Sequence, residues 1–122
     1  MAWPGVVRPA FVPEAAFNEL LANGHRTAGG DTFDPAPVIK LFTPDAGATW
    51  LLSEIDPDDE DLAFGLCDLG LGMPEVGWVR LSELAALRGP MGLPIEQDEW
   101  FKANAELSSY ATSARLEGRI VT

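Results

Sequence analysis

Short apolar runs separated by turn-forming residues make up the middle of the chain. Four of these runs alternate apolar with polar or small residues, which indicates β-strands. They cover residues 37–43, 48–55, 62–70 and 75–81. The gaps contain Pro44, Gly47 and Pro74, residue types that favour tight turns. The pattern therefore predicts an antiparallel meander, in which each strand pairs with the next one along the chain.

An amphipathic helix is predicted before the first strand. Within residues 13–24, Phe17, Leu20 and Leu21 share one stripe of a helix surface. We expect this helix to end at Gly24 and a Gly- and Pro-rich loop to follow over residues 25–37.

Two further helices are predicted after the fourth strand. The first begins with Ser82 as its N-cap and stops at Gly89, which Pro90 follows. The second closes the chain and ends at Gly118, and its apolar positions are Leu107, Tyr110, Ala111 and Ala114. Between the two helices, residues 93–103 are expected to form an edge strand or an extended segment.

These elements predict an α+β fold with a four- to five-stranded, mainly antiparallel sheet. Several strands carry apolar residues on both faces, and we expect the helices to pack on one face. Residues 1–36 are predicted to be a helical and loop appendage that docks through Phe11, Phe17, Leu20 and Leu21. Residues 37–122 are predicted to form a single domain.

Composition narrows the classes of function. The chain has 122 residues, which suits one domain, and a net charge of −11 with eight scattered basic residues. This charge disfavours direct binding to nucleic acids, because it repels phosphates. No apolar run is long enough to span a membrane, and the N-terminus lacks the marks of a signal peptide. A single cysteine, Cys67, fits a reducing cytoplasm, which is the location we expect.

The run IKLFTPDAGATWLLSEIDPDDEDLAFGLCDLGLGMPEVGWVRLSEL resembles the bacterial family known as Domain of Unknown Function 2958. The later segments GPMGLPIEQDEWF and SSYATSARLEGRI resemble it too, so the resemblance covers residues 38–120. It implies an origin on plasmids and other mobile elements of proteobacteria. It implies no activity and no catalytic residues.

The stretch from Glu54 to Asp61 is the densest group of acidic residues, with six acids in eight positions. An EF-hand calcium loop starting at Asp56 would need glycine where Asp61 stands and glutamate where Cys67 stands. We therefore expect an exposed hairpin turn that binds no metal. Two alternatives are a weak, adventitious cation site and a docking patch for a basic partner. The residues of the docking patch are Asp56, Asp58, Asp59, Glu60 and Asp61.

No catalytic, cofactor-binding or metal-binding residue is predicted. In the stretch GLCDLGLG, a Walker phosphate loop would need lysine at Leu71, and a dinucleotide loop would need glycine at Glu75. We expect these glycines to form a bulge and a turn instead. Cys67 is expected to be buried and unreactive, since His25 is the one histidine that could activate it.

Four large aromatic residues are candidate anchors. Alternation places Trp50 in the core, whereas Trp78 fits the core or the surface equally well. Trp100 and Phe101 are adjacent, so a strand directs them to opposite faces, and we expect one of them to be exposed. We select Trp100 as the aromatic candidate for partner binding, because exposed aromatic residues are common binding hot spots.

Two functions remain open from the sequence. The first is a small, acidic, non-enzymatic interaction module whose protein partner carries a basic surface. The second is an enzyme that acts on a small molecule through the strand-end carboxylates of Glu54, Asp68 or Glu75. A pocket lined by at least two of these carboxylates would favour the enzyme.

Overall fold

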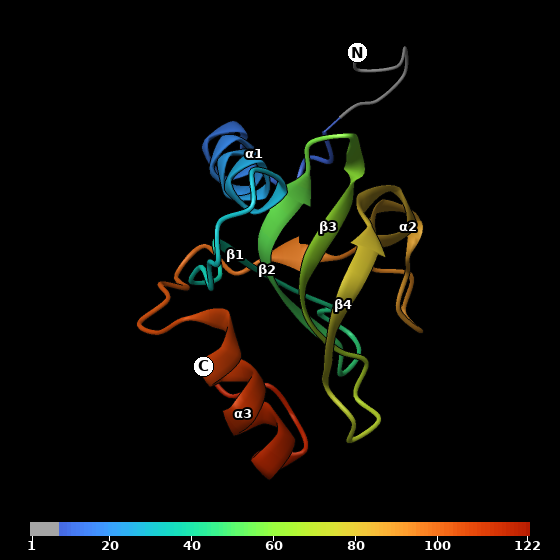
Figure 1. Cartoon of the computed structure of the whole chain (residues 1–122). Coiled ribbons are helices and arrows are strands. Elements are labelled where there is room, and N and C mark those ends of the chain that lie inside the picture. The colour runs from blue at the N-terminus through green and yellow to red at the C-terminus, as the bar shows by residue number, and fades with distance from the viewer. Residues whose placement is uncertain (1–7) are drawn as a thin grey trace.

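The computed structural model describes residues 8–122. Residues 1–7 lie outside the described residues; the predicted appendage begins with them, and the expected absence of a signal peptide concerns them too. The elements follow the order α1 (Glu14–Ala28), β1 (Ile39–Phe42), β2 (Thr49–Asp56), β3 (Asp59–Asp68), β4 (Glu75–Arg80), α2 (Leu81–Ala86), β5 (Glu96–Gln97) and α3 (Leu107–Glu117) (Figure 1). Within this range, five strands form one antiparallel sheet in the order β4-β3-β2-β1-β5. The predicted α+β fold with an antiparallel meander is confirmed.

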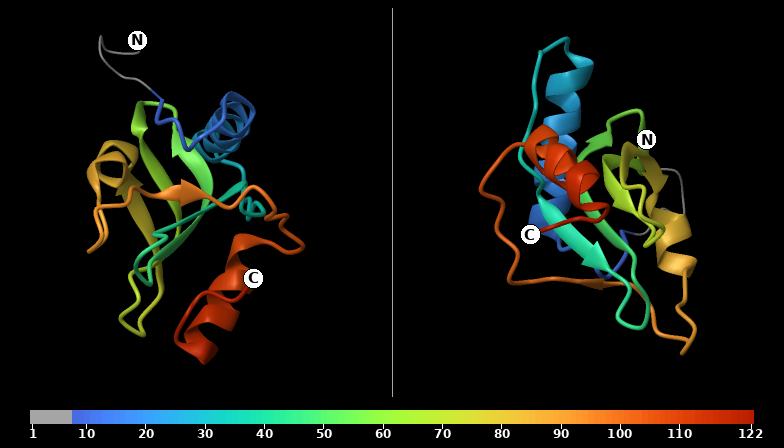
Figure 2. Two further views of the ribbon diagram at one scale, coloured as in Figure 1. Left: turned by 180° about the vertical axis from the view of Figure 1, so that it is seen from behind. Right: turned by 90° about the horizontal axis from the view of Figure 1, so that it is seen from below.

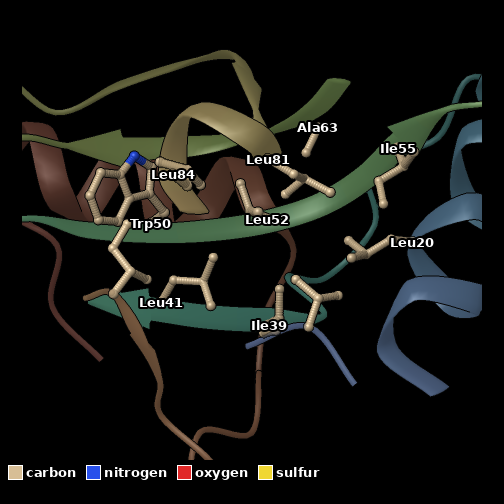
Figure 3. Packing of buried hydrophobic residues seen from close by; sticks show 11 residues of the cluster. Leu20, Ile39, Leu41, Trp50, Leu52, Ile55, Ala63, Leu81 and Leu84 are labelled. Atoms are coloured by element: carbon tan, nitrogen blue, oxygen red, sulfur yellow. The ribbon is translucent and has the colours of Figure 1, made fainter. Parts of the chain in front are cut away.

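The main core lies between the sheet and the first two helices, as Figure 3 shows in close-up. Trp50, which was predicted to be a core residue, is fully buried there. The other large contributors come from β1, β2, α1 and α2, and they are Ile39, Leu41, Leu52, Ile55, Leu20, Leu81 and Leu84. Fully burying each side chain of this size contributes about 1.5–3 kcal/mol before entropy is subtracted.

A β-bulge keeps the apolar side chains of β2 in this core. The register shifts between Leu52 and Glu54, so that Ser53 is the extra residue. Ile55 therefore returns to the core side and is fully buried. Gly65, opposite Leu52, allows the strands to approach, because a Cβ atom there would lie 2.0 Å from a backbone oxygen of β2. The bulge expected in the glycine-rich stretch is therefore in β2, opposite Gly65, and not in that stretch itself.

Helix α1 packs along the part of β2 that β1 leaves unpaired. Strand β1 pairs with residues 49–52 only. Beyond that point, Asn23 Nδ2 donates to the carbonyl of Ser53 at 2.9 Å, and Gly24 lies against the carbonyl of Ile55. The helix continues through Gly24 to Ala28, so the prediction that it ends at Gly24 is wrong. The glycine is there because the two backbones approach closely, and not because the helix stops.

Residues from the predicted appendage take part in the main core. Val12 and Leu20 are fully buried in this core, and the partly exposed Phe11, Phe17 and Leu21 pack against it. The docking through apolar side chains is thus observed. Whether residues 37–122 fold without this segment stays a prediction.

Helix α3 covers the opposite face of the sheet. Leu51 and Leu66 point to that face, and α3 buries them with Leu107, Ala111 and Ala114. In the right-hand view of Figure 2, α3 (red) and α2 (gold) lie on either side of the strands. The helices therefore cover both faces, which corrects the expectation of one covered face. Two apolar faces both need protection from water.

The predicted end of α3 is confirmed. Gly118 follows the helix with φ of 74°, the left-handed conformation that favours glycine at a C-cap. Two residues later, Ile120 returns to the sheet, where its N–H donates to Asp68 Oδ2 at 2.9 Å.

Candidate functional site

The acidic stretch forms the end of the β2–β3 hairpin, and its turn is tighter than predicted. Asp56 pairs with Asp59, so Pro57 and Asp58 alone connect the two strands. Asp56 Oδ1 accepts the N–H of Asp58 at 2.9 Å, a bond that stabilises the turn. Glu54 is only 6% exposed and accepts a hydrogen bond from the hydroxyl of Thr27 at 2.8 Å. The expectation that the whole stretch is exposed is therefore wrong for Glu54.

Two of the acids hold α2 and β4 in place. Asp59 forms an ion pair with Arg80 at 3.0 Å, and this hydrogen bond raises the pKa of the guanidinium. Asp61 accepts the N–H of Ser82 at 2.8 Å and its hydroxyl at 2.6 Å. Asp61 thus caps α2 from a neighbouring strand. The prediction that Ser82 is the N-cap is wrong. Arg80 occupies the N-cap position, and its side chain makes no capping hydrogen bond.

The side chains of Asp58 and Glu60 remain available for a partner. Within residues 8–122, neither carboxylate makes a hydrogen bond or an ion pair, and Asp58 is exposed at the turn. In the same range, no three side chains of histidine, cysteine, aspartate or glutamate gather closely enough to hold a metal ion. The predicted lack of metal binding still needs a titration.

The three strand-end carboxylates do not form one site. Asp68 pairs with Thr49 and Glu54 with Phe64, so the two acids are four residues apart along β3, or roughly 13 Å. Asp68 is 3% exposed and accepts hydrogen bonds from two backbone N–H groups, those of Gly70 and Ile120. It holds the chain after α3 against the sheet, which is a structural role. Glu75 is exposed at the start of β4.

Cys67 and His25 are also far apart. Cys67 lies opposite Trp50 and packs against the main core, and burial raises the pKa of its thiol to about 11. His25 is exposed on α1, next to Gly24, which contacts Ile55. Ile55 pairs with Ala63, which is four residues from Cys67 along β3, and this again corresponds to roughly 13 Å. The histidine is thus too far away to activate the thiol.

The glycine-rich stretch after Cys67 forms the predicted turn. Gly70 and Gly72 have φ of 80° and 81°, a conformation that side chains larger than hydrogen rarely adopt. The chain then enters strand β4 and not a helix, so this turn does not lead into a helix N-terminus that could hold a phosphate.

Trp100 lies at the edge of a surface groove. Its side chain is 92% exposed, whereas the adjacent Phe101 packs against the core under α3. The expectation that one of these two aromatic residues is exposed is confirmed. The groove has a volume of about 460 Å³ and runs between the loop that follows β5, helix α3 and the end of the chain. In Figure 1 this loop (orange) extends outward beside the C-terminus.

Hydrogen bonds fix the loop that carries Trp100. Asp98 Oδ1 accepts the N–H of Trp100 at 3.0 Å, and the carbonyl of Asp98 accepts the N–H of Phe101 at 3.2 Å. The other carboxylate oxygen of Asp98 lies 3.5 Å from Lys40 Nζ of β1. These contacts make a turn that directs Trp100 outward and Phe101 inward.

The far wall of the groove is built around Tyr110, which sequence reasoning did not assign to a site. Its hydroxyl donates to Asn104 Oδ1 at 2.9 Å and accepts the N–H of Asn104 at 3.1 Å. Its ring centroid lies 6.2 Å from that of Phe101. Ser109, Ser113 and Thr122 add hydroxyl groups to the lining. Tyr110 follows the apolar spacing of α3, and this spacing gave no sign of a second role.

Comparison with known proteins identifies a family but no activity. No curated protein and no solved structure matches the chain. Within the described residues, no helix is long and apolar enough to cross a membrane. One family matches residues 11–121, a range that extends the resemblance at residues 38–120 to include α1. The protein therefore belongs to the family described as Protein of unknown function (DUF2958).

Proposed function

We propose that the protein is a non-enzymatic interaction module that binds a partner protein with a basic surface. The exposure of Trp100 beside a preformed groove carries this proposal. A side chain of this size is normally buried, because it has a large apolar surface. Exposed tryptophan next to a rigid hollow is the arrangement from which binding hot spots are commonly built.

The groove supports binding more than catalysis. Its walls are held by hydrogen bonds around Asp98 and between Asn104 and Tyr110, so little conformational entropy would be lost on binding. None of the strand-end carboxylates considered for an enzyme lines it. Trp100 and the ring of Tyr110 offer apolar contact area, and the hydroxyl groups of the lining offer hydrogen bonds for orientation.

The charge of the protein supports a basic partner. The net charge is −11, and Glu99 and Glu106 are exposed on the loop that forms the groove. Lys102 is the one exposed cation of the same loop. At the β2–β3 turn, Asp58 and Glu60 add a second acidic region that a basic partner could reach. Complementary charge would accelerate association and exclude acidic partners such as nucleic acids.

The setting we propose follows from the resemblance and from the single cysteine. A plasmid or another mobile element is the genetic origin that the resemblance implies, and host defence, replication or conjugation proteins are then suitable partners. A reducing cytoplasm is the location that fits one cysteine and no disulfide.

Affinity capture from the native host tests the proposal. The tagged wild-type protein should retain a specific protein, identified by mass spectrometry, and Trp100→Ala should lose it. Met91→Ala is the matched control, since Met91 is an exposed apolar residue, 80% accessible, in a different loop. A hot-spot tryptophan contributes about 2 kcal/mol or more, so the captured amount should fall by about 30-fold at limiting concentration.

Two results would contradict the proposal. One is that no protein is enriched over a control with an unrelated acidic protein. The other is that Trp100→Ala and wild type capture the same proteins in equal amounts, which would remove Trp100 from the site.

A further inference from the structure

Strand β4 is an open edge of the sheet. It lies at one end of the strand order, and within the described residues it pairs with β3 alone. The N–H and carbonyl groups along the outer side of such a strand can pair with another chain. The opposite edge is β5, which has only two residues, Glu96–Gln97, and so offers almost no surface for pairing.

The sequence of β4 lacks the features that usually protect an edge. It reads EVGWVR, with no proline and no lysine, and its pairing with β3 has no bulge. Its one cation, Arg80, is already held by Asp59 and Asp61 at 3.0 and 3.6 Å. Two of its large apolar side chains are substantially exposed, Val76 at 41% and Trp78 at 51%.

A hollow lies beside this edge, where α2 packs near β4. Its volume is about 420 Å³, and its apolar lining includes Trp50, Leu69, Trp78, Leu84 and Leu87. The ring of Trp78 is held in place by Phe64, with centroids 5.1 Å apart. In recognition by strand addition, backbone pairing supplies affinity and adjacent hollows accept alternate side chains. Both parts are present at β4.

The charges around β4 indicate which kind of chain can pair with this edge. Glu75 at the start of β4 and Glu83 in the hollow are acidic. At the other end of β4, Arg80 pairs with Leu62, and Glu60 lies two residues beyond that pair on β3. A second copy of this chain would bring another net charge of −11 to the same place. An incoming strand with basic side chains would instead be attracted at both ends of β4 and at the hollow, where the charge of Arg80 is offset by Asp59 and Asp61.

We propose that β4 binds an extended segment of a partner protein, with alternating apolar and basic residues, which adds to the sheet as a further strand. The apolar side chains enter the hollow beside Trp78, and the basic side chains lie near Glu75, Glu83 and Glu60. This surface is at the edge opposite to Trp100, which follows β5. The inference takes only the basic character of the partner from the proposed function and is otherwise independent of the groove.

A defined peptide tests this proposal. The probe is a capped heptapeptide of alternating lysine and valine, titrated into the full-length protein while backbone amide shifts are followed by NMR. The largest shifts are expected in residues 75–80 and in Trp78. The same peptide with N-methyl groups on two adjacent central residues cannot pair at either edge. It should bind at least about tenfold more weakly, because one N–H donor facing β4 is lost and the methyl group in its place keeps the two backbones too far apart for the neighbouring hydrogen bonds.

Variants separate strand addition from general charge attraction. Trp78→Ala should weaken binding of the probe by about tenfold or more, while Met91→Ala should leave it unchanged. Because Trp78 packs on Phe64, Gly77→Lys provides a second variant that does not disturb packing. A Cβ atom at Gly77 meets nothing within 4 Å, and the added lysine repels the basic probe.

Three results would overturn the proposal. The first is equal affinity for the methylated and unmethylated peptides, which would mean that charge alone binds the probe. The second is a set of shifts centred on Asp58 and Glu60 or on Trp100 and not on β4. The third is a concentration-dependent dimer in sedimentation that Gly77→Lys dissociates, because a second copy would then be the occupant. The outcome at Trp100 in affinity capture is a separate result and decides the proposed function alone.

Discussion

Gly24→Ala should destabilise the protein although it improves the helix in isolation. In the middle of a helix, alanine is favoured over glycine by about 1 kcal/mol. The Cβ atom of alanine at this position, however, would lie 1.7 Å from the carbonyl oxygen of Ile55 and 2.8 Å from its carbonyl carbon. Both are backbone atoms of β2, so no flexible side chain can move aside to remove the clash.

The magnitude follows from the distance that α1 must move. A normal contact needs more than 3 Å, so the helix has to retreat by roughly 1.5 Å, and the contacts around Leu20 and the bond from Asn23 to Ser53 weaken. Overpacking of this kind typically costs about 1–3 kcal/mol. For a chain of 122 residues, 1 kcal/mol corresponds to about 4 °C in Tm, so we expect a decrease of about 4–12 °C.

Thermal and urea unfolding followed by circular dichroism measure this effect, with Ala22→Gly as the control. Ala22 is exposed on the same helix, so its replacement should cost only the propensity difference of about 1 kcal/mol. The reasoning fails if Gly24→Ala raises the free energy of unfolding by about 1 kcal/mol. That result would mean that α1 does not approach β2 closely and that helix propensity alone determines how the substitution at Gly24 changes the free energy of unfolding.

Four further predictions concern single features. Cys67 should react slowly with a thiol reagent at pH 8 and quickly in denaturant. Burial raises the pKa of its thiol to about 11, so little reactive thiolate is present at pH 8. Rapid labelling of the folded protein would contradict the burial. Asp68→Asn should lower the free energy of unfolding by about 1.5–3 kcal/mol in urea titrations, since one of two charge-assisted acceptors is lost. An unchanged free energy of unfolding would show that the hydrogen bond from Ile120 to Asp68 does not stabilise the fold. Deletion of residues 1–36 should leave a folded protein with a lower Tm and dispersed amide resonances, and an aggregated product would show that the domain boundary is misplaced. Calorimetric titration of calcium, magnesium and manganese should reveal no site tighter than roughly millimolar in residues 54–61, and a micromolar site would refute the hairpin-turn interpretation.

The strand pattern could be predicted because its signals are local. Alternating apolar residues and turn residues lie next to one another in the sequence, and the four main strands appear within a few residues of their predicted positions. Adjacent Trp100 and Phe101 are a local signal of the same kind, and the prediction that one is exposed is confirmed. The groove beside Trp100 could not be predicted, because Tyr110 and the last residues complete it from another part of the chain.

The incorrect predictions share a different cause. A glycine that ends a helix and a glycine that allows two backbones to approach are identical in sequence, and Gly24 proves to be the second kind. Ser82 fits an N-cap by residue type, yet Asp61 reaches the helix from β3, 21 residues away. Glu54 belongs to an acidic run but is buried, and it accepts a hydrogen bond from Thr27 of α1. In each case a contact between distant residues decides the role, and local pattern does not contain it.

The acidic run also changes meaning once its contacts are known. From composition alone it is one patch of negative charge. In the fold, Asp56, Asp59 and Asp61 stabilise the turn, the ion pair with β4 and the start of α2, which leaves Asp58 and Glu60 for a partner. The case for an interaction module therefore depends less on this run than on the exposed apolar surfaces at the two edges of the sheet.

The most direct test of the interaction module is the dissociation constant of the captured partner, measured with purified proteins by calorimetry at low and at high salt. We predict saturable binding that weakens as salt is added, because a basic surface meets an acidic one. We also predict that Trp100→Ala weakens binding by about 30-fold at both salt concentrations, because the tryptophan contributes apolar contact area and not charge. Binding that is insensitive to both salt and Trp100→Ala would contradict the account.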